Sequence, residues 1–466
     1  MKGLEPISLE RLVKMKKIKK ALIIGIDGVP CSLLSHFLKN DVMPNVKEIL
    51  NQSFTLHKMS ASIPDVSSVS WTSFATGVNP GEHGIFGFID LQPQDYSLYF
   101  PNSRDVKAPP FWEILGKTNR TTSTLSQRYS AKVGHPHRSI IFNLPHTYPA
   151  SPMNGTLVSG FVAIDLRKAV FPESAYAYLQ SMNYLIDVDA EKAKVDKRQF
   201  LNELFDCFEI RKKAIFHFFN DKPWDIFLAC ITETDRLHHF FFDASNDEKN
   251  PYYEFFLNFY VKLDKFIKAL YDRFMEKNAE QGFFMILSDH GFAPVKTEVY
   301  INPFLEKMGF LQLRKDGQFY ERMTDQTRAF DLDPCRIHIN DEETFHRGTV
   351  KRAERAQLLQ EIREALRGLK WENGEEAIDK IYQKEEIYQG PHLNRAPDLV
   401  CLPKDGYDLK SGIEKKEMFG RTIFSGMHTW HDALCILPSK IHFSGKPSID
   451  QLVEYILQYF TQSEKT

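Results

Sequence analysis

The sequence has few of the features that mark secreted, membrane-spanning or disulfide-bonded proteins. Only six of its 466 residues are cysteine, and none of them has the CxxC or CxH spacing of a zinc ribbon. Several lie in apolar runs such as IFLAC and ALCIL, which indicates buried free thiols in a reducing compartment. No apolar run approaches the roughly 18 residues that a transmembrane helix needs.

The chain also lacks a strong net charge. Lys and Arg number 59, Asp and Glu number 61, and the formal charge is −2, so no whole-protein field favours nucleic acid or an anionic membrane. A basic arm at 1–19 precedes the apolar run 21–26, which ends at Asp27 and is too short for a signal peptide. We therefore expect a cytoplasmic protein that does not bind nucleic acid.

What the chain has in abundance is apolar surface to bury. Hydrophobic residues make up 42% of the chain, and 37 residues are Phe. Short β-branched runs alternate with longer helical patterns, which is typical of an α/β fold with a largely parallel sheet. The predicted strands are 21–27, 139–145, 225–235, 282–291, 335–340, 398–403 and 433–438; the predicted helices are 41–52, 197–220, 252–280 and 351–369.

Two segments, 87–111 and 302–395, do not follow this alternation well. We expect a single catalytic domain over 20–466, with cap or insert segments at about 87–111, 145–220 and 302–395. These inserts are the parts of the chain that would shape a substrate pocket.

Acidic residues follow three of the predicted strands. Asp27 follows ALIIGI, Asp235 follows IFLACITET, and Asp289 with His290 follows FFMILS. An Asp at any one of these places could be a turn or a helix cap. Together they indicate a site, because ligands of open α/β sheets gather at the carboxyl ends of the strands.

Histidines extend this set of acidic residues. His239 stands four residues after Asp235 and would share a helix face with it, and His238 is its competitor. His428 lies in a loop before a predicted strand. Mixed carboxylate and imidazole ligands suit Zn²⁺, with Mn²⁺ as the alternative, and the set is large enough for two metal ions.

The segment ASIPDVSSVSWTSFATG at 61–77 is rich in hydroxyl groups and is predicted to run from a loop into a helix that ends near Gly77. A hydroxyl at the start of that helix would gain from the helix dipole and from free backbone N–H groups. Ser67 fits this place, but it could equally be only the helix cap. Spacing alone leaves Ser68 and Ser70 as rivals.

The order and spacing of several motifs resemble a known family. These motifs are IGIDG, MPNVKEIL, IPDVSSVSWTSFATGVNPGEHGI, TETDRLHHFFF, ILSDHGF, APDLV and SGMHTWHDALCI. The chain resembles the type I phosphodiesterase/nucleotide pyrophosphatase family of the alkaline phosphatase superfamily, in its prokaryotic phosphohydrolase or phosphomutase branch. This resemblance implies a three-layer α/β/α sandwich.

The resemblance also implies roles for individual residues. The family's nucleophile falls on Ser67, one metal site on Asp27, Ser67, Asp289 and His290, and the other on Asp235, His239 and His428. Ser70 stands where diesterases often have Asn, so Ser70 or the backbone of Ser68 would hold a substrate oxygen. The sulfatase pattern after the nucleophile is missing, and the GHPHR segment at 134–138 has no counterpart in the family; it could reach the cleft or be only a loop.

These roles imply a phosphohydrolase that cleaves small-molecule phosphate esters through a phosphoseryl intermediate and two metal ions. A phosphomutase-type isomerase or a phosphomonoesterase could use the same site. A non-catalytic metal-binding protein is the alternative of another class.

Overall fold

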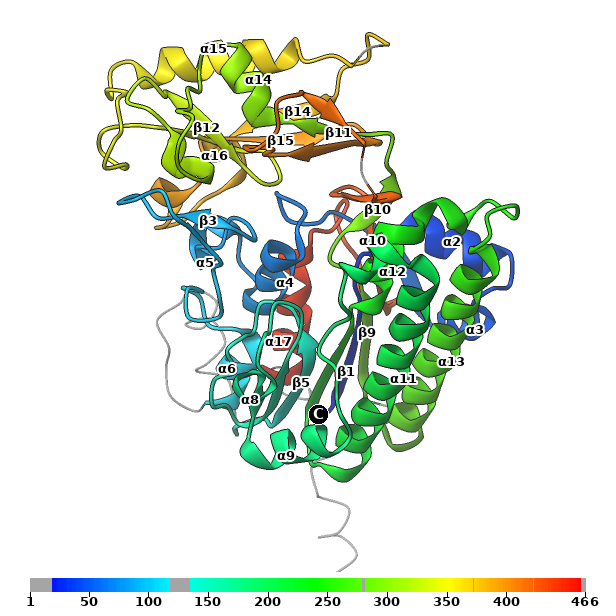
Figure 1. Ribbon diagram of the computed structural model, residues 1–466. Coiled ribbons are helices and arrows are strands. Elements are labelled where there is room, and N and C mark those ends of the chain that lie inside the picture. The colour runs from blue at the N-terminus through cyan, green and yellow to red at the C-terminus, as the bar shows by residue number, and fades with distance from the viewer. Residues whose placement is uncertain (1–18, 118–134, 279–280, 372, 422, 462–466) are drawn as a thin grey trace, which may run out of the picture.

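The computed structural model describes residues 19–117, 135–278, 281–371, 373–421 and 423–461. The basic arm expected at 1–19 lies outside the described residues except for Lys19. Figure 1 shows a large layered body that contains the central sheet, with a smaller body above it. Among the described residues, none of the helices has both the length and the apolar character that crossing a membrane requires.

The large body is built on an eight-stranded sheet whose central five strands, β9-β1-β8-β5-β6, run parallel. The edge strand β7 and the neighbouring strand β19 are antiparallel to these five strands. In spatial order the strands are β2 (Phe54–Met59), β19 (Ala433–Pro438), β9 (Phe283–Leu287), β1 (Ala21–Ile26), β8 (Ile226–Ile231), β5 (Ser139–Leu144), β6 (Gly155–Ser159) and β7 (Val170–Phe171).

Helices cover both faces of this sheet, because its central strands are apolar on both sides. In β1, Leu22 and Ile24 enter one core while Ala21 and Ile23 enter the other. The first core packs against α2 (Cys31–Lys39), α3 (Pro44–Asn51), α11 (Lys197–Asp221), α12 (Glu233–Phe241) and α13 (Tyr253–Asn278). The second packs against α4 (Ser67–Thr76), α6 (Phe111–Gly116) and α17 (Leu452–Thr461). The expected α/β/α sandwich is confirmed.

The smaller body, which we call the cap, spans residues 297–420 and has a hydrophobic core of its own. Its strands form two sheets, β16-β11-β17 and β12-β13-β15-β14. Their bounds are β11 (Thr297–Tyr300), β12 (Ala329–Leu332), β13 (Arg336–Ile339), β14 (Ile378–Gln383), β15 (Leu399–Pro403), β16 (Tyr407–Lys410) and β17 (Phe419–Gly420); the cap helices are α14 (Ile301–Lys307), α15 (Arg355–Arg367) and α16 (Lys384–Ile387). The strands expected at 335–340 and 398–403 therefore pair with each other in the cap.

A short antiparallel pair, β10 (Gly291–Pro294) and β18 (Gly426–Thr429), connects the sandwich to the cap. The other α-helices and strands of the described residues are β3 (Asp90–Leu91), β4 (Leu98–Tyr99), α5 (Pro80–His83), α8 (Leu166–Ala169), α9 (Glu173–Ser181) and α10 (Lys192–Val195). The strands expected at 225–235 and 282–291 are shorter in the structure. The first ends at Ile231, after which the chain enters α12, and the second ends at Leu287. Asp235 thus lies in the first turn of a helix.

Candidate metal site and nucleophile

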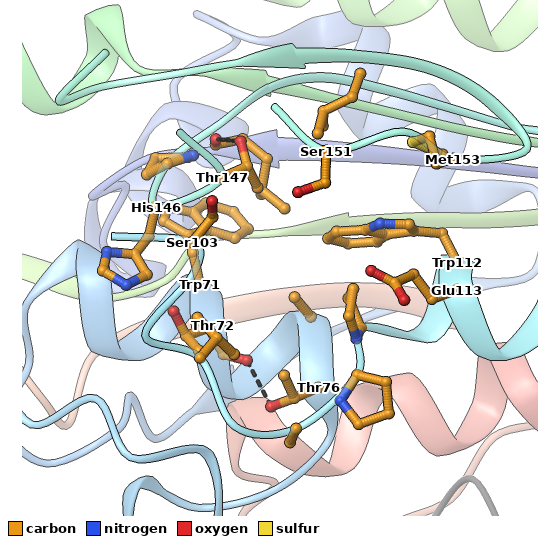
Figure 2. Close-up of a pocket in the computed structure, with 18 of the residues that line it drawn as sticks. Trp71, Thr72, Thr76, Ser103, Trp112, Glu113, His146, Thr147, Ser151 and Met153 are labelled. Carbon is orange, nitrogen blue, oxygen red and sulfur yellow. Dashed lines mark hydrogen bonds between the residues drawn. The ribbon is translucent and has the colours of Figure 1, made fainter. Parts of the chain in front are cut away.

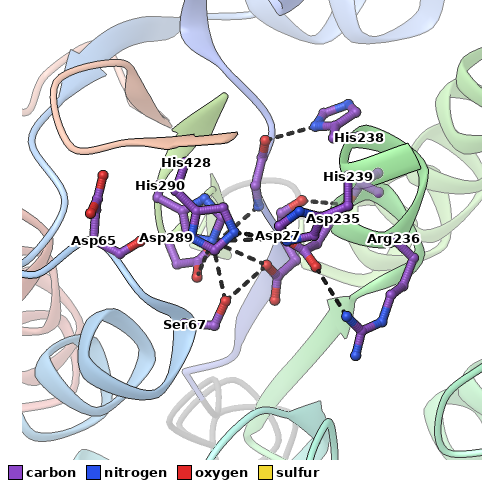
Figure 3. A network of polar contacts seen from close by, with 12 residues as sticks. Asp27, Asp65, Ser67, Asp235, Arg236, His238, His239, Asp289, His290 and His428 are labelled. Atoms are coloured by element: carbon purple, nitrogen blue, oxygen red, sulfur yellow. Dashed lines mark hydrogen bonds and ion pairs between the residues drawn. The ribbon is translucent and has the colours of Figure 1, made fainter. Parts of the chain in front are cut away.

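The carboxyl ends of three neighbouring strands bring the acidic residues together. Asp27 follows β1, Asp289 and His290 follow β9, and Asp235 lies on α12 just after β8. Since β9, β1 and β8 are adjacent and parallel, their following residues meet at one edge of the sheet. Figure 3 shows these side chains converging from the ends of the strands.

One group of side chains surrounds the first position where a metal ion could bind. Ligand atoms of Asp27, Asp289 and His290 all lie within 4.8 Å of one another. His290 Nε2 is 3.3 Å from Asp289 Oδ2 and 3.8 Å from Asp27 Oδ1. Ser67 Oγ lies 3.2 Å from His290 Nε2 and 3.4 Å from Asp27 Oδ1, so the hydroxyl faces this group.

A second group adjoins the first and shares His290 with it. Ligand atoms of Asp235, His290 and His428 also lie within 4.8 Å of one another. His428 Nε2 is 3.3 Å from Asp235 Oδ1 and 3.0 Å from His239 Nε2, and His239 Nε2 is 3.5 Å from Asp235 Oδ1. The structure therefore brings all the expected ligand residues into one cluster.

His238, the alternative to His239, serves the fold. It is fully buried; its Nδ1–H donates to the carbonyl of Gly28 at 2.9 Å, and its Nε2 accepts from the Tyr260 hydroxyl at 2.6 Å. The Gly28 N–H in turn donates to Asp289 Oδ1 at 3.0 Å. His238 thereby fixes the turn after β1, and Figure 3 shows its ring directed away from the cluster.

Ser67 is the first residue of α4 and is not its cap. The N-cap position is Val66, and no side chain caps this helix end, so the interpretation of Ser67 as a simple cap is wrong. Ser68 is buried, and its hydroxyl has no hydrogen-bond partner among the described residues. Ser70 is fully buried, and its Oγ accepts from the N–H of Ser62 at 3.3 Å. Only the Ser67 hydroxyl of these three contacts the expected metal ligands.

The electrostatics of the cluster favour a bound cation. Burial, together with the carboxylates of Asp289 and Asp235, raises the pKa of Asp27 well above its usual range. Burial also opposes ionisation of Asp235, but the imidazoles of His239 and His428 outweigh it and hold its pKa below the usual range. Burial would lower the pKa of His428, but its contact with the Asp235 carboxylate outweighs burial and raises this pKa above the ordinary value.

Unsatisfied polar atoms in the cluster fit metal ions. Asp235 Oδ1, Asp289 Oδ2 and His239 Nδ1 are buried without a hydrogen-bond partner in the part of the chain that the structure describes. Buried carboxylates are expected to be paired or to coordinate metals. The donor set of Asp oxygen and His nitrogen is the kind that Zn²⁺ and Mn²⁺ accept.

Two residues that the sequence reasoning missed hold the ligands in place. Trp71 Nε1–H donates to Asp27 Oδ2 at 2.9 Å inside the protein. Arg236 NH1 lies 3.8 Å from Asp235 Oδ2, while the same guanidinium pairs with Asp187 at 2.5 Å. A tryptophan four residues after Ser67 is itself a signal, since buried indole N–H groups need an acceptor.

A cavity of about 320 Å³ opens between the cluster and the cap. His239 and His428 line it from the sandwich, and Asp408 and Lys410 line it from the cap. Lys410 Nζ lies 3.1 Å from Asp408 Oδ2, so the cap offers an ion pair to this space. The cavity is large enough for a small ester group attached to phosphorus.

A separate cavity of about 250 Å³ lies beside α4 (Figure 2). Trp71, Trp112 and His146 line it, and it includes none of the expected metal ligands.

The described part of the GHPHR segment, 135–138, precedes the amino end of β5. It therefore lies at the edge of the sheet opposite the cluster, and of the two alternatives left open for this segment the structure favours a loop away from the cleft.

This sandwich, with its ligands at the carboxyl edge, is that of a phosphoester hydrolase of the alkaline phosphatase superfamily. The family model "Type I phosphodiesterase / nucleotide pyrophosphatase" matches residues 21–431, and the chain belongs to this family. No curated protein matches the sequence.

Two solved structures share the fold at low sequence identity. Phosphonoacetate hydrolase from Sinorhizobium meliloti 1021, in complex with phosphonoformate, is 13% identical with a TM-score of 0.60, over 95% of this chain and 96% of that one. Murine ectonucleotide pyrophosphatase / phosphodiesterase 5 is 14% identical with a TM-score of 0.53, over 96% of both chains.

Proposed function

We propose that the protein hydrolyses small-molecule phosphoesters, in the manner of a phosphodiesterase or nucleotide pyrophosphatase, with Ser67 as the nucleophile. The observation that carries this proposal is the position of Ser67 Oγ, 3.4 Å from Asp27 and 3.2 Å from His290 at the start of α4. A hydroxyl there is flanked by prospective metal ligands and lies at the positive end of a helix dipole.

Two divalent cations, Zn²⁺ or alternatively Mn²⁺, would be held by the cluster. Asp27, Ser67, Asp289 and His290 would hold one, and Asp235, His239 and His428 the other. When bound, such ions supply positive charge that lowers the pKa of the serine hydroxyl and stabilises charge on the phosphoryl and leaving oxygens. Asp235 Oδ1 and Asp289 Oδ2, which are buried without a hydrogen-bond partner among the described residues, support this assignment.

The residues of the chain then act in two displacements at phosphorus. In the first, Ser67 Oγ loses its proton and bonds to phosphorus, while the bond to the leaving oxygen breaks and that oxygen takes up a proton. In the second, water attacks the phosphoserine, releases the phosphate product and restores the hydroxyl. The Ser68 backbone N–H, or the Ser70 hydroxyl, would hold a non-bridging oxygen during both steps.

The protein would work in a reducing compartment, and we propose the cytoplasm. The six cysteines are all buried and free of disulfide bonds, and this supports the proposal.

The test is turnover of bis-p-nitrophenyl phosphate and p-nitrophenyl phosphate, with metal content measured on the same samples. We expect Ser67→Ala to abolish turnover while it keeps the bound metal and the fold. Thr76→Ala is the control, because it removes a hydroxyl that donates to the Thr72 carbonyl at the far end of the same helix. Full activity of Ser67→Ala would rule out the nucleophile assignment. Cleavage of the monoester alone would make the protein a phosphomonoesterase.

A further inference from the structure

A wide groove lies along the same edge of the sheet as the metal ligands. The ligands follow β9, β1 and β8, and the next strands in order are β5, β6 and β7. The chain just beyond the carboxyl ends of β5 and β6 lines the groove, together with β7. The groove therefore continues the ligand-binding edge of the sheet past the metal site.

The groove is large and mostly apolar. Its volume is about 970 Å³, at the upper end of the roughly 300–1,000 Å³ usual for small-molecule sites. Its walls carry the side chains of Phe100, Tyr148, Phe161, Val162, Ile164 and Phe171.

Two of these side chains expose unusually large apolar surfaces to water. Ile164 is 88% exposed and Phe100 is 55% exposed. Single exposed apolar residues are ordinary, but two at the rim of one apolar groove mark a binding surface.

Aromatic contacts connect the groove to the cavity at the metal site. Phe88 lines that cavity, and its ring stacks on Phe161 with centroids 5.5 Å apart and planes at 6°. The rings of Phe88 and Phe100 also meet in a T-shaped arrangement, with their centroids 5.4 Å apart. The guanidinium of Arg236 lies over the Phe161 ring, 4.3 Å from its centre. The same guanidinium is 3.8 Å from the carboxylate of Asp235. The stacked rings of Phe88 and Phe161 thus join a wall of the cavity at the cluster to a wall of the groove.

Three cationic side chains, Arg104, Arg167 and Lys168, line the groove, and two of them have carboxylate neighbours. Arg167 pairs with Glu173 at 2.9 Å, and Lys168 lies 3.7 Å from Asp165. Arg104 has no carboxylate partner among the described residues, but apolar side chains outnumber the cations in the lining, so the groove offers mainly apolar surface.

We propose that this groove binds an alkyl or acyl chain esterified to the phosphorus of the substrate, so that the substrates are amphiphilic phosphoesters. The proposal rests on the proposed function, and it names the substrate class of the same site. The phosphorus lies at the cluster, and the chain passes Phe88 to lie against Phe161 and Ile164.

The experiment uses methyl, butyl and octyl p-nitrophenyl phosphates below their aggregation concentrations. All three esters release the same p-nitrophenolate, so kcat/KM compares only the chains. Full burial of a methylene is worth about fourfold in binding, and a half-buried chain about twofold. We expect the octyl ester to exceed the methyl ester by on the order of a hundredfold in kcat/KM. A flat series would overturn the proposal.

Variants at the rim locate the effect. Ile164→Ser and Phe100→Ser should each lower the octyl-to-methyl ratio by about fivefold or more. Val195→Ser is the matched control, because Val195 is 90% exposed and does not line the groove. Rim variants that keep the wild-type ratio overturn the proposal. So does a flat series in which the rim variants instead lose binding to phosphatidylcholine–phosphatidylglycerol vesicles, which would make the groove a membrane-contact surface.

The two proposals fail in different ways. If the wild-type protein cleaves none of the esters, or Ser67→Ala cleaves them equally well, the proposed function is wrong. If the wild-type protein cleaves all three at the same rate and Ser67→Ala cleaves none, only the groove assignment is wrong.

Discussion

Replacing Trp71 with Phe tests whether the protein, beyond the ligands themselves, tunes the metal site. Trp71 Nε1–H donates to Asp27 Oδ2 at 2.9 Å, and Trp71 and Asp27 are almost completely buried. The substitution leaves that carboxylate oxygen without its donor. A hydrogen bond to a charged group is worth about 1.5–3 kcal/mol, which is about 10–150-fold in an equilibrium constant. We therefore expect the dissociation constant for Zn²⁺ at the Asp27 site to rise by about 10–100-fold.

The assay is competition of the purified protein with a zinc chelator of known affinity. The control is Trp112→Phe, since Trp112 is also buried and lines the same cavity as Trp71. Both variants lose part of an indole ring, so both should lose similar packing stability, but only Trp71→Phe removes a donor to Asp27. Equal zinc affinity in Trp71→Phe and the wild-type protein would refute the reasoning. An equal loss in both variants would assign the effect to packing.

Chelation of the metals should lower the melting temperature in calorimetry, because it leaves the carboxylates of the cluster unpaired; an unchanged melting temperature would contradict this. His239→Ala should lose bound metal in elemental analysis. His238→Phe should keep the metal but lose about 1–3 kcal/mol of stability, because the Tyr260 hydroxyl loses its hydrogen-bond partner. The reverse result would exchange the two roles. Burial lowers the pKa of His83 to about 3, below the unfolded value of about 6.5, so stability should fall by about 1.4 kcal/mol per unit as pH drops from 6.5 towards 3. In urea unfolding at pH 6 and pH 4.5, the free energy of unfolding of His83→Gln should fall less between the two pH values than that of the wild-type protein. An equal fall in both proteins would contradict the assignment.

The alternation of strands and helices predicts an α/β fold with a largely parallel sheet, and the resemblance to a known family adds the three layers; the candidate ligands can be proposed from the sequence for a physical reason. Strands buried on both faces are nearly continuous apolar runs, so the first polar residues after them stand out. Asp27 and Asp289 were visible in this way, and parallel pairing of β1 with β9 brings them together. Asp235 stood out in the same way, and the four-residue spacing of a helix face, which α12 provides, linked His239 to it; the family resemblance decided between His239 and His238.

Contacts between distant segments lay beyond the sequence. The run 225–235 has no glycine or proline to end the strand, but the chain enters α12 at Glu233, whose carboxylate pairs with Arg211 of α11 at 2.6 Å inside the core. The donor role of Trp71 and the stack of Phe161 under Arg236 are likewise set by packing across the fold. Periodicity along one segment carries no information about such partners.

The position of the cap in the chain links it mechanically to the metal site. It enters after β10 and returns through β18, and these two strands pair antiparallel with Phe292 opposite His428. His428 therefore stands on the strand by which the cap rejoins the sandwich, while its Nε2 lies 3.3 Å from Asp235 on α12. A rigid displacement of the cap that pulled on β18 would move a proposed ligand relative to the ligands on the sandwich. The ion pair of Asp408 and Lys410, which faces the cavity from the cap, thus belongs to a body whose position is tied to His428.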